Sequence, residues 1–408
     1  MKLNKLVIAL GLMAAAPAFA QAPAAGGDPP PPWKQGMGAD SATSTLHPFS
    51  PNFTGAEAKD LPIDKLKVPA GFKVEVWAEG VPEARSLALG DKSTVFVSNR
   101  LAKNTYAVID RGGKREVKTI LKGLNSPNGI VFSKGTLFVA ERDKITRYDG
   151  IEDNLDNPPA PKLVFAGTDP TNGPGHFWKY LAMGPDGKLY FNIGSPQNIA
   201  MPNYIQAAIP RVDPKTGKFE TIATGVRNSV GMDFHPVTKQ LWFTDHGRDW
   251  LGDELPHDEL NVVTKTGENF GFPWCHQGDT PDPEYGKYRD CASTTAPVLK
   301  LGPHVAPLGM HFYTGKMFPA EYKNNIFIAR HGSWNRNTKH GYDVMRVVLD
   351  AKGKAVKYEP FLTGFVINDK GDPPMWGRPV DLLQLKDGSL LVSEDHNGII
   401  YRISYAKK

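Results

Sequence analysis

Residues 173–194 read Gly173-Pro-Gly-His-Phe-Trp-Lys-Tyr-Leu-Ala-Met-Gly-Pro-Asp-Gly-Lys-Leu-Tyr-Phe-Asn-Ile-Gly194, a phrase that recurs in looser form along the chain. Two strand-like runs, residues 180–183 and 188–193, are joined by Gly184-Pro-Asp-Gly187. Proline at the second position of a turn and glycine at the fourth favour a tight reversal, so the stretch predicts a β-hairpin. A loop of Gly and Pro just before the hairpin presents one histidine, His176. A polar side chain at the mouth of a rigid hairpin is a common position for functional groups in β-folds.

The same pattern, a strand, a turn and a more apolar strand, occurs six times in the chain. The apolar strands begin at residues 95, 137, 189, 241, 326 and 390, with long insertions after the fourth and the fifth. Multi-strand units that repeat every ~40–50 residues are typical of β-propellers, in which neighbouring blades cover both faces of a strand. We therefore predict an all-β chain folded as a six-bladed β-propeller, without a long amphipathic helix. Residues 72–77 should close the last blade beside residues 399–403, and a β-sandwich is the alternative.

The N-terminal region predicts export. Residues 1–20 combine a short basic start, an apolar run and small residues at the end, which is the pattern of a secretory signal cleaved after Ala20. Residues 21–66 are rich in Pro, Ala, Gly and Ser and are interpreted as a mobile arm with some docking near its end, and residues 67–408 as the propeller. No later run approaches the ~20 apolar residues of a membrane span, so we expect a periplasmic or secreted protein without membrane insertion.

Charge and cysteine content narrow the function classes further. The net charge is +5, and Lys and Arg form no dense cluster, which argues against a nucleic-acid partner. The two cysteines are Cys275 and Cys291. In an oxidising compartment this pair predicts a disulfide, with two free thiols as the alternative.

Four polar clusters lie where loops of different blades should meet. Nucleotide-binding glycine motifs, the serine-hydrolase G-x-S-x-G and the zinc motif H-E-x-x-H are all absent. The first cluster is His176, a residue suited to taking an alcohol proton, although a lone loop histidine is more often structural. The second is Arg227-Asn228 between glycines, which offers a fixed cation and an amide to a planar anion; an arginine that pairs with a nearby acid is the plainer interpretation.

The third cluster runs from Thr244 through Gly247-Arg248-Asp249 to Asp253-Glu254 and Asp258. Carboxylates and glycine-exposed carbonyls are the oxygen ligands that Ca²⁺ prefers, although a solvated acidic loop would have the same composition. The fourth combines residues 330–336, which include His331, with Arg378. It adds cations at the equivalent ends of the fifth and sixth blades.

Taken together, these motifs resemble the quinoprotein sugar dehydrogenases of the sorbosone dehydrogenase type, which are related to soluble glucose and aldose sugar dehydrogenases. The resemblance spans residues 68–403 and rests on the sequences around the clusters above. It further includes Asp258-Glu-Leu-Asn261, Asn269-Phe-Gly-Phe-Pro273 and residues 304–315. Members of that family are six-bladed propellers that carry pyrroloquinoline quinone (PQQ) and calcium, so the resemblance implies both cofactors here.

The resemblance also implies roles for individual residues. His176 matches the catalytic base, and Arg227 and Asn228 match a pair that contacts the quinone, with Arg227 also stabilising the developing oxyanion. Arg378 matches an arginine that binds a quinone carboxylate, and His331 lies near a further cofactor contact.

Three positions are implied at the calcium ion, and two positions depart from the glucose dehydrogenase pattern. Gly247 and Arg248 fall where two backbone carbonyls hold the ion, and Asp258 matches a nearby carboxylate. Arg248 replaces a proline of that pattern, and Ser195 stands where an aspartate orients the base.

The implied function is oxidation of an aldose or a related, sorbosone-like sugar or aldehyde to a lactone or acid. His176 would take the hydroxyl proton while hydride passes to PQQ, and an exported acceptor such as a c-type cytochrome would receive the electrons. Two alternatives are a Ca²⁺-dependent propeller lactonase, which needs several carboxylates on one axial metal, and a non-catalytic binding propeller.

Overall fold

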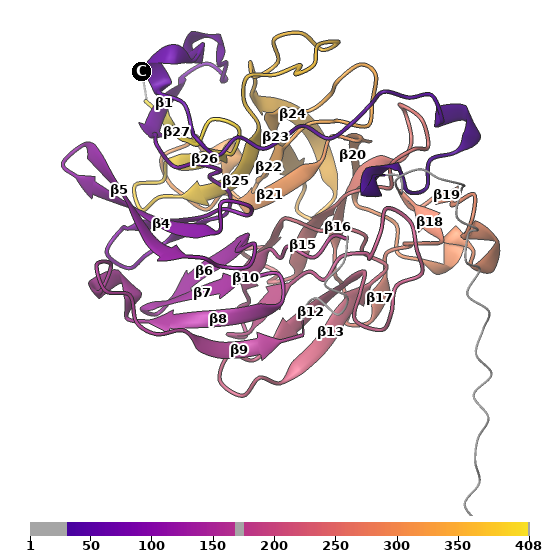
Figure 1. Cartoon of the computed structure of the whole chain (residues 1–408), viewed down its shortest axis with the longest axis horizontal. Helices are drawn as coiled ribbons and strands as arrows, with labels where there is room; N and C mark the ends of the chain where they lie inside the picture. The colour runs from indigo at the N-terminus through magenta and orange to yellow at the C-terminus, as the bar shows by residue number, and fades with distance from the viewer. Residues whose placement is uncertain (1–30, 168–174, 407–408) are drawn as a thin grey trace, which may run out of the picture. The chain divides into compact units, whose positions relative to one another are not determined.

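Antiparallel sheets follow one another along the chain as the blades of a propeller (Figure 1). The computed structural model describes residues 31–167 and 175–406, and within these ranges six sheets have the inside-to-outside order of a blade. The predicted signal, residues 1–20, and Gly173-Pro174 of the opening phrase lie outside the described residues. In the first three blades the strands are β2 (Leu87–Leu89), β3 (Val95–Ser98), β4 (Asn104–Arg111) and β5 (Lys114–Lys122); β6 (Gly129–Ser133), β7 (Thr136–Ala140), β8 (Lys144–Asp149) and β9 (Lys162–Ala166); and β10 (Leu181–Met183), β11 (Leu189–Phe191), β12 (Ala208–Val212) and β13 (Phe219–Thr224).

The second half of the propeller holds the insertions that the sequence predicts. Its blades are β14 (Met232–Phe234), β15 (Leu241–Asp245), β16 (His257–Val262) and β20 (Leu299–Pro303); β21 (Pro307–Phe312), β22 (Ile326–Arg330), β23 (Asp343–Leu349) and β24 (Ala355–Leu362); and β25 (Pro379–Gln384), β26 (Leu390–Glu394), β27 (Ile399–Tyr405) and β1 (Phe72–Ala78). Between β16 and β20, β17 (Glu268–Asn269) adds to the third blade, and β18 (Cys275–His276) pairs with β19 (Thr280–Pro281).

The ring of blades closes through the N-terminal strand, as predicted. The innermost strands contact one another in the order β2, β6, β10, β14, β21, β25 and again β2. Strand β1 pairs antiparallel with β27, with Val74 opposite Ile403 and Phe72 opposite Tyr405. The sixth blade is therefore built from both ends of the propeller sequence, and the six-bladed all-β prediction is confirmed.

The hairpin of residues 181–191 follows its turn chemistry, but its strands are shorter than predicted. Gly187 adopts φ 73° and its N–H donates to the Gly184 carbonyl at 2.9 Å, which closes the expected turn. Strand β10 begins at Leu181 because the Tyr180 N–H donates instead to the side chain of Asn192, at 2.7 Å. A side-chain acceptor thus replaces the partner strand at this position.

Apolar clusters fill the spaces between neighbouring blades. Phe96 and Val139, for example, are buried between the first and second blades, and Phe138 and Phe191 between the second and third. Each apolar strand thereby contributes alternate side chains to two clusters, which explains why these strands are apolar along their whole length.

Short 3-10 helices are the helical elements of the described residues. They are η1 (Pro32–Lys34), η2 (Ala39–Ser41), η3 (Ala58–Asp60), η4 (Ile63–Lys65), η5 (Ile151–Asp153), η6 (Gly286–Tyr288), η7 (Cys291–Ser293) and η8 (Ala320–Tyr322). Across residues 31–167 and 175–406, no helix has the length and apolar character that a membrane span requires.

Candidate active site

One end of the propeller collects the side chains that the sequence analysis singled out. In each blade the first two strands are antiparallel, so the residues before the first strand and after the second lie at the same end. His176 precedes β10, Arg227 precedes β14 and Arg378 precedes β25, whereas Gly247 follows β15 and His331 follows β22. Topology alone therefore brings these five residues to one end.

Ser195 holds the side chain of His176. The His176 Nδ1 atom lies 3.0 Å from Ser195 Oγ and 3.3 Å from the Ser195 carbonyl oxygen. Ser195 Oγ itself donates to the Gln197 carbonyl at 2.5 Å, so toward His176 it can only accept. Nδ1 therefore carries the proton and donates, which leaves the lone pair on Nε2.

Backbone hydrogen bonds also fix the position of His176. The His176 N–H donates to the Ser195 carbonyl at 2.9 Å, and the Ser195 N–H donates to the Arg227 carbonyl at 2.8 Å. A Cβ on Gly194 would lie 2.3 Å from the His176 carbonyl oxygen, so only glycine allows the three segments to approach. Burial, with the charge of Arg227 and the neighbouring His246, lowers the pKa of His176 well below 6.5. The imidazole is neutral at neutral pH and can accept a proton.

The carboxylate of Asp245 fixes the backbone of the Arg227-Asn228 loop. Its two carboxylate oxygens accept the N–H groups of Arg227, at 2.8 Å, and of Asn228, at 2.6 Å. The Arg227 guanidinium donates to the Asn198 carbonyl and to Asn198 Oδ1, both at 2.8 Å, and lies 3.4 Å from Asp249 Oδ2. Arg227 is thus a buried cation in a fixed orientation.

Asn228 presents a buried acceptor. Its Nδ2 donates to His246 Nδ1 at 3.1 Å, and His246 Nε2 donates to the Pro307 carbonyl at 2.8 Å. Burial lowers the pKa of His246 to about 4, so this neutral tautomer is stable. Asn228 Oδ1 is buried and accepts no hydrogen bond from the described residues. A donor from a bound molecule would satisfy it.

The backbone carbonyls of Gly247 and Arg248 are also without donors. Among the described residues, no N–H or O–H donates to either oxygen. Asp258 fixes the loop, since its Oδ1 accepts the Gly247 N–H and its Oδ2 accepts the Ala306 N–H, both at 2.8 Å. Two free carbonyls beside a buried carboxylate form an oxygen-rich environment that a hard cation can use.

The acidic side chains of the third sequence cluster do not gather around one point. Asp253 accepts from Asn337 at 3.1 Å and Glu254 pairs with Arg336 at 2.6 Å, so neither joins Asp258. In the described part of the chain, no three His, Cys, Asp or Glu side chains converge as metal ligands. The candidate cation site therefore rests on backbone carbonyls rather than on a cage of carboxylates.

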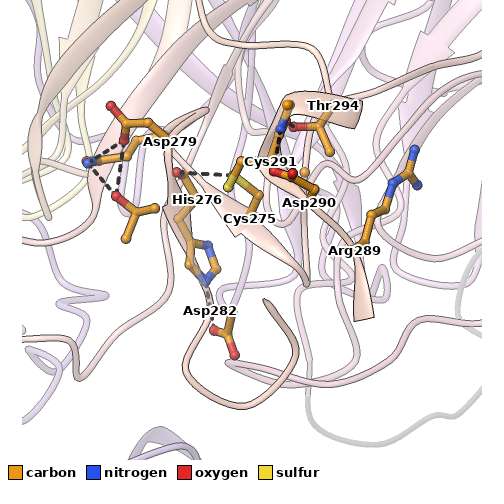
Figure 2. Close-up of a disulfide and its surroundings, with 12 residues drawn as sticks. Cys275, His276, Asp279, Asp282, Arg289, Asp290, Cys291 and Thr294 are labelled. Atoms are coloured by element: carbon orange, nitrogen blue, oxygen red, sulfur yellow. Dashed lines mark hydrogen bonds and ion pairs between the residues drawn. A yellow bond between two sulfur atoms is a disulfide. The ribbon is translucent and has the colours of Figure 1, made fainter. Parts of the chain in front are cut away.

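The side chain of Arg248 reaches the disulfide loop, where it donates to Asp282. Figure 2 shows Asp282 with His276 beside the bond between Cys275 and Cys291. The Arg248 guanidinium lies 2.7 Å from Asp282, whose carboxylate is also 2.8 Å from His276 Nε2. Burial opposes ionisation of Asp282, but His276 and Arg248 together lower its pKa well below the ordinary range. Cys275 and Cys291 are bonded, which confirms the predicted disulfide and closes the loop that carries Asp282.

A second group of charged residues lies at the same end, and of these Arg85 and Asp395 were missed from the sequence. Arg85, 2% exposed, donates to Asn128 Oδ1 at 2.6 Å and to Asp395 at 2.5 Å. Asp395 also accepts from His331 Nε2 at 2.8 Å, and Arg378 Nε donates to the His331 carbonyl at 3.1 Å. Burial, with Arg378 in the same direction, lowers the pKa of His331 to about 3, so His331 is a neutral donor here.

Arg100 completes the cationic surface. Its guanidinium lies 4.5 Å from the centre of the Trp178 ring, and that ring lies 6.4 Å from the ring of His176. Arg100 Nε is buried without a hydrogen-bond partner in residues 31–167 and 175–406, and Glu83 is 3.9 Å away. Burial, with Arg85 in the same direction, lowers the pKa of Arg100 to about 10. A partly buried guanidinium whose Nε lacks a partner among the described residues favours an anionic ligand.

Hydrogen bonds connect these groups from blade to blade around the ring. In chain order the links are Arg85 to Asn128, Asn128 to the Lys179 carbonyl, Ser195 to the Arg227 carbonyl, His246 to the Pro307 carbonyl, His331 to Asp395 and Asp395 to Arg85. Each candidate residue is thus held by a partner from its own blade or the next.

Comparison with known proteins identifies the family. The Glucose / Sorbosone dehydrogenase family model matches residues 199–402, and a TrAA12-like model matches residues 66–282. An uncharacterized protein of Borreliella burgdorferi is 36% identical over 355 residues, which cover 84% of this chain and 91% of that protein. The chain belongs to the glucose/sorbosone dehydrogenase family.

One more distant relative of this glucose/sorbosone dehydrogenase family member has a described activity. A pyrroloquinoline quinone-dependent pyranose dehydrogenase of Coprinopsis cinerea is 24% identical over 87% of this chain, which spans 56% of that enzyme. The holo form of its PQQ domain superposes with a TM-score of 0.72 at 21% identity, covering 83% of this chain and 97% of the domain. The calcium structure of the Trichoderma reesei Family AA12 protein gives 0.74 at 19% identity, with coverages of 88% and 99%. At these identities the structures share the fold.

Within the glucose/sorbosone dehydrogenase fold of this chain, the sequence located the loops but not all their partners. Arg85, Asn128 and Asp395 precede or follow strands at positions equivalent to those of Arg227 and His331. Their place in the repeat was therefore a usable signal, although no local motif marks them.

Proposed function

We propose that this protein is a quinoprotein sugar dehydrogenase that oxidises an aldose or a related sugar or aldehyde. The observation that carries the proposal is His176, a neutral histidine whose proton is fixed on Nδ1 by Ser195 beside the buried Arg227. A base in this state can accept the proton of a substrate hydroxyl at Nε2. The pyranose dehydrogenase of Coprinopsis cinerea supports the substrate class.

The donor set fits PQQ, an o-quinone that carries several carboxylates. Arg100 and Arg378 offer N–H groups to carboxylates. Among the residues that the structure describes, Arg100 Nε has no hydrogen-bond partner, and the Arg378 guanidinium donates through Nε to the His331 carbonyl. Asn228 Oδ1 is a buried acceptor without a donor, and the Gly247 and Arg248 carbonyls suit a calcium ion held with the quinone. When bound, PQQ with calcium supplies the two-electron acceptor of the reaction.

The residues of the chain itself would divide the remaining work. His176 Nε2 takes the proton of the hydroxyl that is being oxidised, and Ser195 keeps the imidazole ring in that orientation. Arg227 holds a positive charge next to His176, where negative charge develops during the reaction. Asp245 and Asn198 fix Arg227, so this charge does not reorganise as the reaction proceeds.

The product would be a lactone or an acid, and the electrons would pass to an external acceptor such as a c-type cytochrome. The disulfide and the signal-like start of the sequence support a periplasmic or secreted location. Exported protein should begin at Gln21, and its intact mass tests this.

The decisive experiment adds PQQ and Ca²⁺ to the purified full chain and follows dye-linked oxidation of a sugar panel. We expect oxidation that depends on both additions. Arg227→Ala and Arg378→Ala should each weaken PQQ binding about 10- to 150-fold, because each removes a charge-assisted contact of about 1.5–3 kcal/mol. Unchanged PQQ affinity in both variants would show that the quinone site is misplaced, and no oxidation of any sugar would contradict the function.

A further inference from the structure

A cavity of about 450 Å³ opens beside the candidate active site. Residues 40–46 of the N-terminal arm form one wall, and the loops of residues 250–253 and 335–337 form the other. Its volume lies within the roughly 300–1,000 Å³ of small-molecule sites. Neither His176 nor Arg227 lines it, so it is distinct from the site described above.

The N-terminal arm is fixed to the propeller just before it reaches this cavity. Trp250 Nε1 donates to the Trp33 carbonyl at 2.7 Å, and the side chain of Gln35 bonds both the N–H and the carbonyl of Ile199, at 2.9 and 2.8 Å. Gly36 accepts from Arg248 at 2.8 Å, and a Cβ on Gly36 would lie 2.9 Å from that side chain. The arm is therefore held firmly against the propeller just before it forms one wall of the cavity.

Asn335 lines the cavity, and its side-chain amide is buried. It is 4% exposed, and its Oδ1 accepts the Trp250 N–H at 2.8 Å. Its Nδ2 is buried and has no hydrogen-bond partner among the described residues. An unsatisfied buried amide costs free energy unless a ligand or water accepts from it.

The other lining groups suit a polyol. Asp40 makes no hydrogen bond or ion pair within residues 31–167 and 175–406, and Ser41, Thr43 and Thr45 add hydroxyls. Trp250 has already committed its Nε1 to Trp33, so it offers ring carbons, which suit the apolar C–H face of a pyranose.

The charge of the lining excludes anionic ligands. Asp40 and Asp253 are its charged residues, and no Lys, Arg or His lines the cavity. A phosphate, a uronic acid or another carboxylate would meet like charge without a counter-ion. A neutral sugar unit meets donors and acceptors without that repulsion.

The cavity and the candidate active site share a wall. Trp250 directly follows Asp249, which lies 3.4 Å from the Arg227 guanidinium. A ligand that occupied the cavity and also reached His176 would need more than one sugar ring, because different residues line the two sites. We propose that the cavity binds a neutral sugar unit of an oligosaccharide whose reducing end is oxidised at His176, an inference that rests on the proposed sugar dehydrogenase function for its link to catalysis.

The catalytic test compares glucose with maltose, maltotriose, cellobiose and cellotriose, using full-length protein loaded with PQQ and Ca²⁺. We expect kcat/KM to be about tenfold higher for at least one oligosaccharide than for glucose. Asp40→Ala and Asn335→Asp should each remove about fivefold of that advantage, the worth of roughly one hydrogen bond, and leave glucose oxidation unchanged. Asn335→Asp keeps the acceptor for Trp250 and replaces the amide donor with a carboxyl oxygen. Asp64→Ala, an exposed aspartate of the same arm outside the cavity, is the control and should match the wild type.

A binding test separates this inference from the proposed function. Maltotriose and cellotriose are titrated onto the same proteins without PQQ, with tryptophan fluorescence and calorimetry as readouts. Binding that Asp40→Ala and Asn335→Asp weaken supports the cavity even if no sugar is oxidised. The inference is overturned if neither trisaccharide binds the wild type, or if the variants bind and discriminate sugars as the wild type does.

Discussion

At the scale of single residues, the candidate base depends on how its proton is placed. Ser195 Oγ and the Ser195 carbonyl both accept from His176 Nδ1. The neutral serine thus fixes the proton on Nδ1, a role that a carboxylate could also fill. A serine fixes the tautomer but adds no negative charge. Burial lowers the pKa of His176 by more than the backbone hydrogen bond to Ser195 raises it, and no carboxylate at this contact adds to that rise.

Replacing the base should stop proton transfer without unfolding the site. His176→Gln keeps a polar side chain of similar reach, so PQQ affinity and melting temperature should stay near the wild-type values. Reduction of the bound quinone by sugar should slow about 10²–10⁴-fold, the usual worth of a positioned base. Stopped-flow absorbance measures that step, and a wild-type rate in His176→Gln would remove His176 from the mechanism.

The pH dependence of the same step follows from the lowered pKa of His176. Burial and Arg227 favour the neutral form, so the base stays unprotonated until the pH falls well below 6.5. We expect the rate to be flat between pH 8 and 6.5 and to fall only at lower pH. Circular dichroism at each pH serves as the control for unfolding. A midpoint at or above pH 6.5 would contradict this environment for His176.

At the scale of elements, the long insertion between β16 and β20 supports the loop that carries the candidate calcium carbonyls. The disulfide closes a loop whose cross-link is worth roughly 3 kcal/mol in the chain-entropy model. Within that loop, Asp282 is fully buried and pairs with Arg248, 2% exposed. Arg248 thus fastens the insertion to the candidate site.

Removing Asp282 should therefore act on stability and on calcium together. Asp282→Ala leaves the buried guanidinium of Arg248 with Glu284 and the carbonyls of Gly36 and Asp249 as its partners among the described residues. The change should cost about 3 kcal/mol of unfolding free energy. Urea unfolding measures the stability, and calcium titration with PQQ present should show weaker binding. Asp279→Ala, whose pair with Lys300 is exposed in the same loop, should change stability by less than about 1 kcal/mol. Equal stability of the two variants would refute the proposed role of the buried pair.

At the scale of the whole propeller, strand β1 joins the two ends of the sequence. Phe72 begins this strand and lies within 4.8–5.1 Å, between ring centres, of Phe318, Tyr322, Phe361 and Tyr405. These rings belong to the fifth and sixth blades and their connections. The N-terminal strand therefore closes the last blade by its backbone and anchors the neighbouring blade by one aromatic side chain.

Truncating that side chain should loosen the closure. Phe72→Ala should lower the free energy of unfolding by about 3 kcal/mol, at the low end for a buried aromatic residue because Phe72 is only half-buried. Thermal unfolding followed by tryptophan fluorescence measures the loss. Lys73→Ala, exposed on the same strand, should stay within about 0.5 kcal/mol of the wild type. A Phe72→Ala variant as stable as Lys73→Ala would show that closure does not depend on this cluster.

The sequence by itself determined the repeat and therefore most of the fold. Apolar runs, alternation and turn residues such as Gly184-Pro-Asp-Gly187 are local signals, and each is sufficient to predict one hairpin. Six hairpins in order predict six blades, and a leftover N-terminal strand predicts the closure by β1. The same repeat predicted which end of the blades carries His176, Arg227, His331 and Arg378.

Only the tertiary structure decided how those groups are held. Arg85 bonds Asn128, 43 positions away, and Asp395, 310 positions away, and no local pattern specifies partners at such separations. For the same reason, the sequence did not predict that the Arg248 side chain reaches Asp282. It also did not predict that the N-terminal arm attaches at Trp33 and Gln35. A closed ring of blades makes neighbours of residues from opposite ends of the chain, so its polar contacts exist only after the ring has formed.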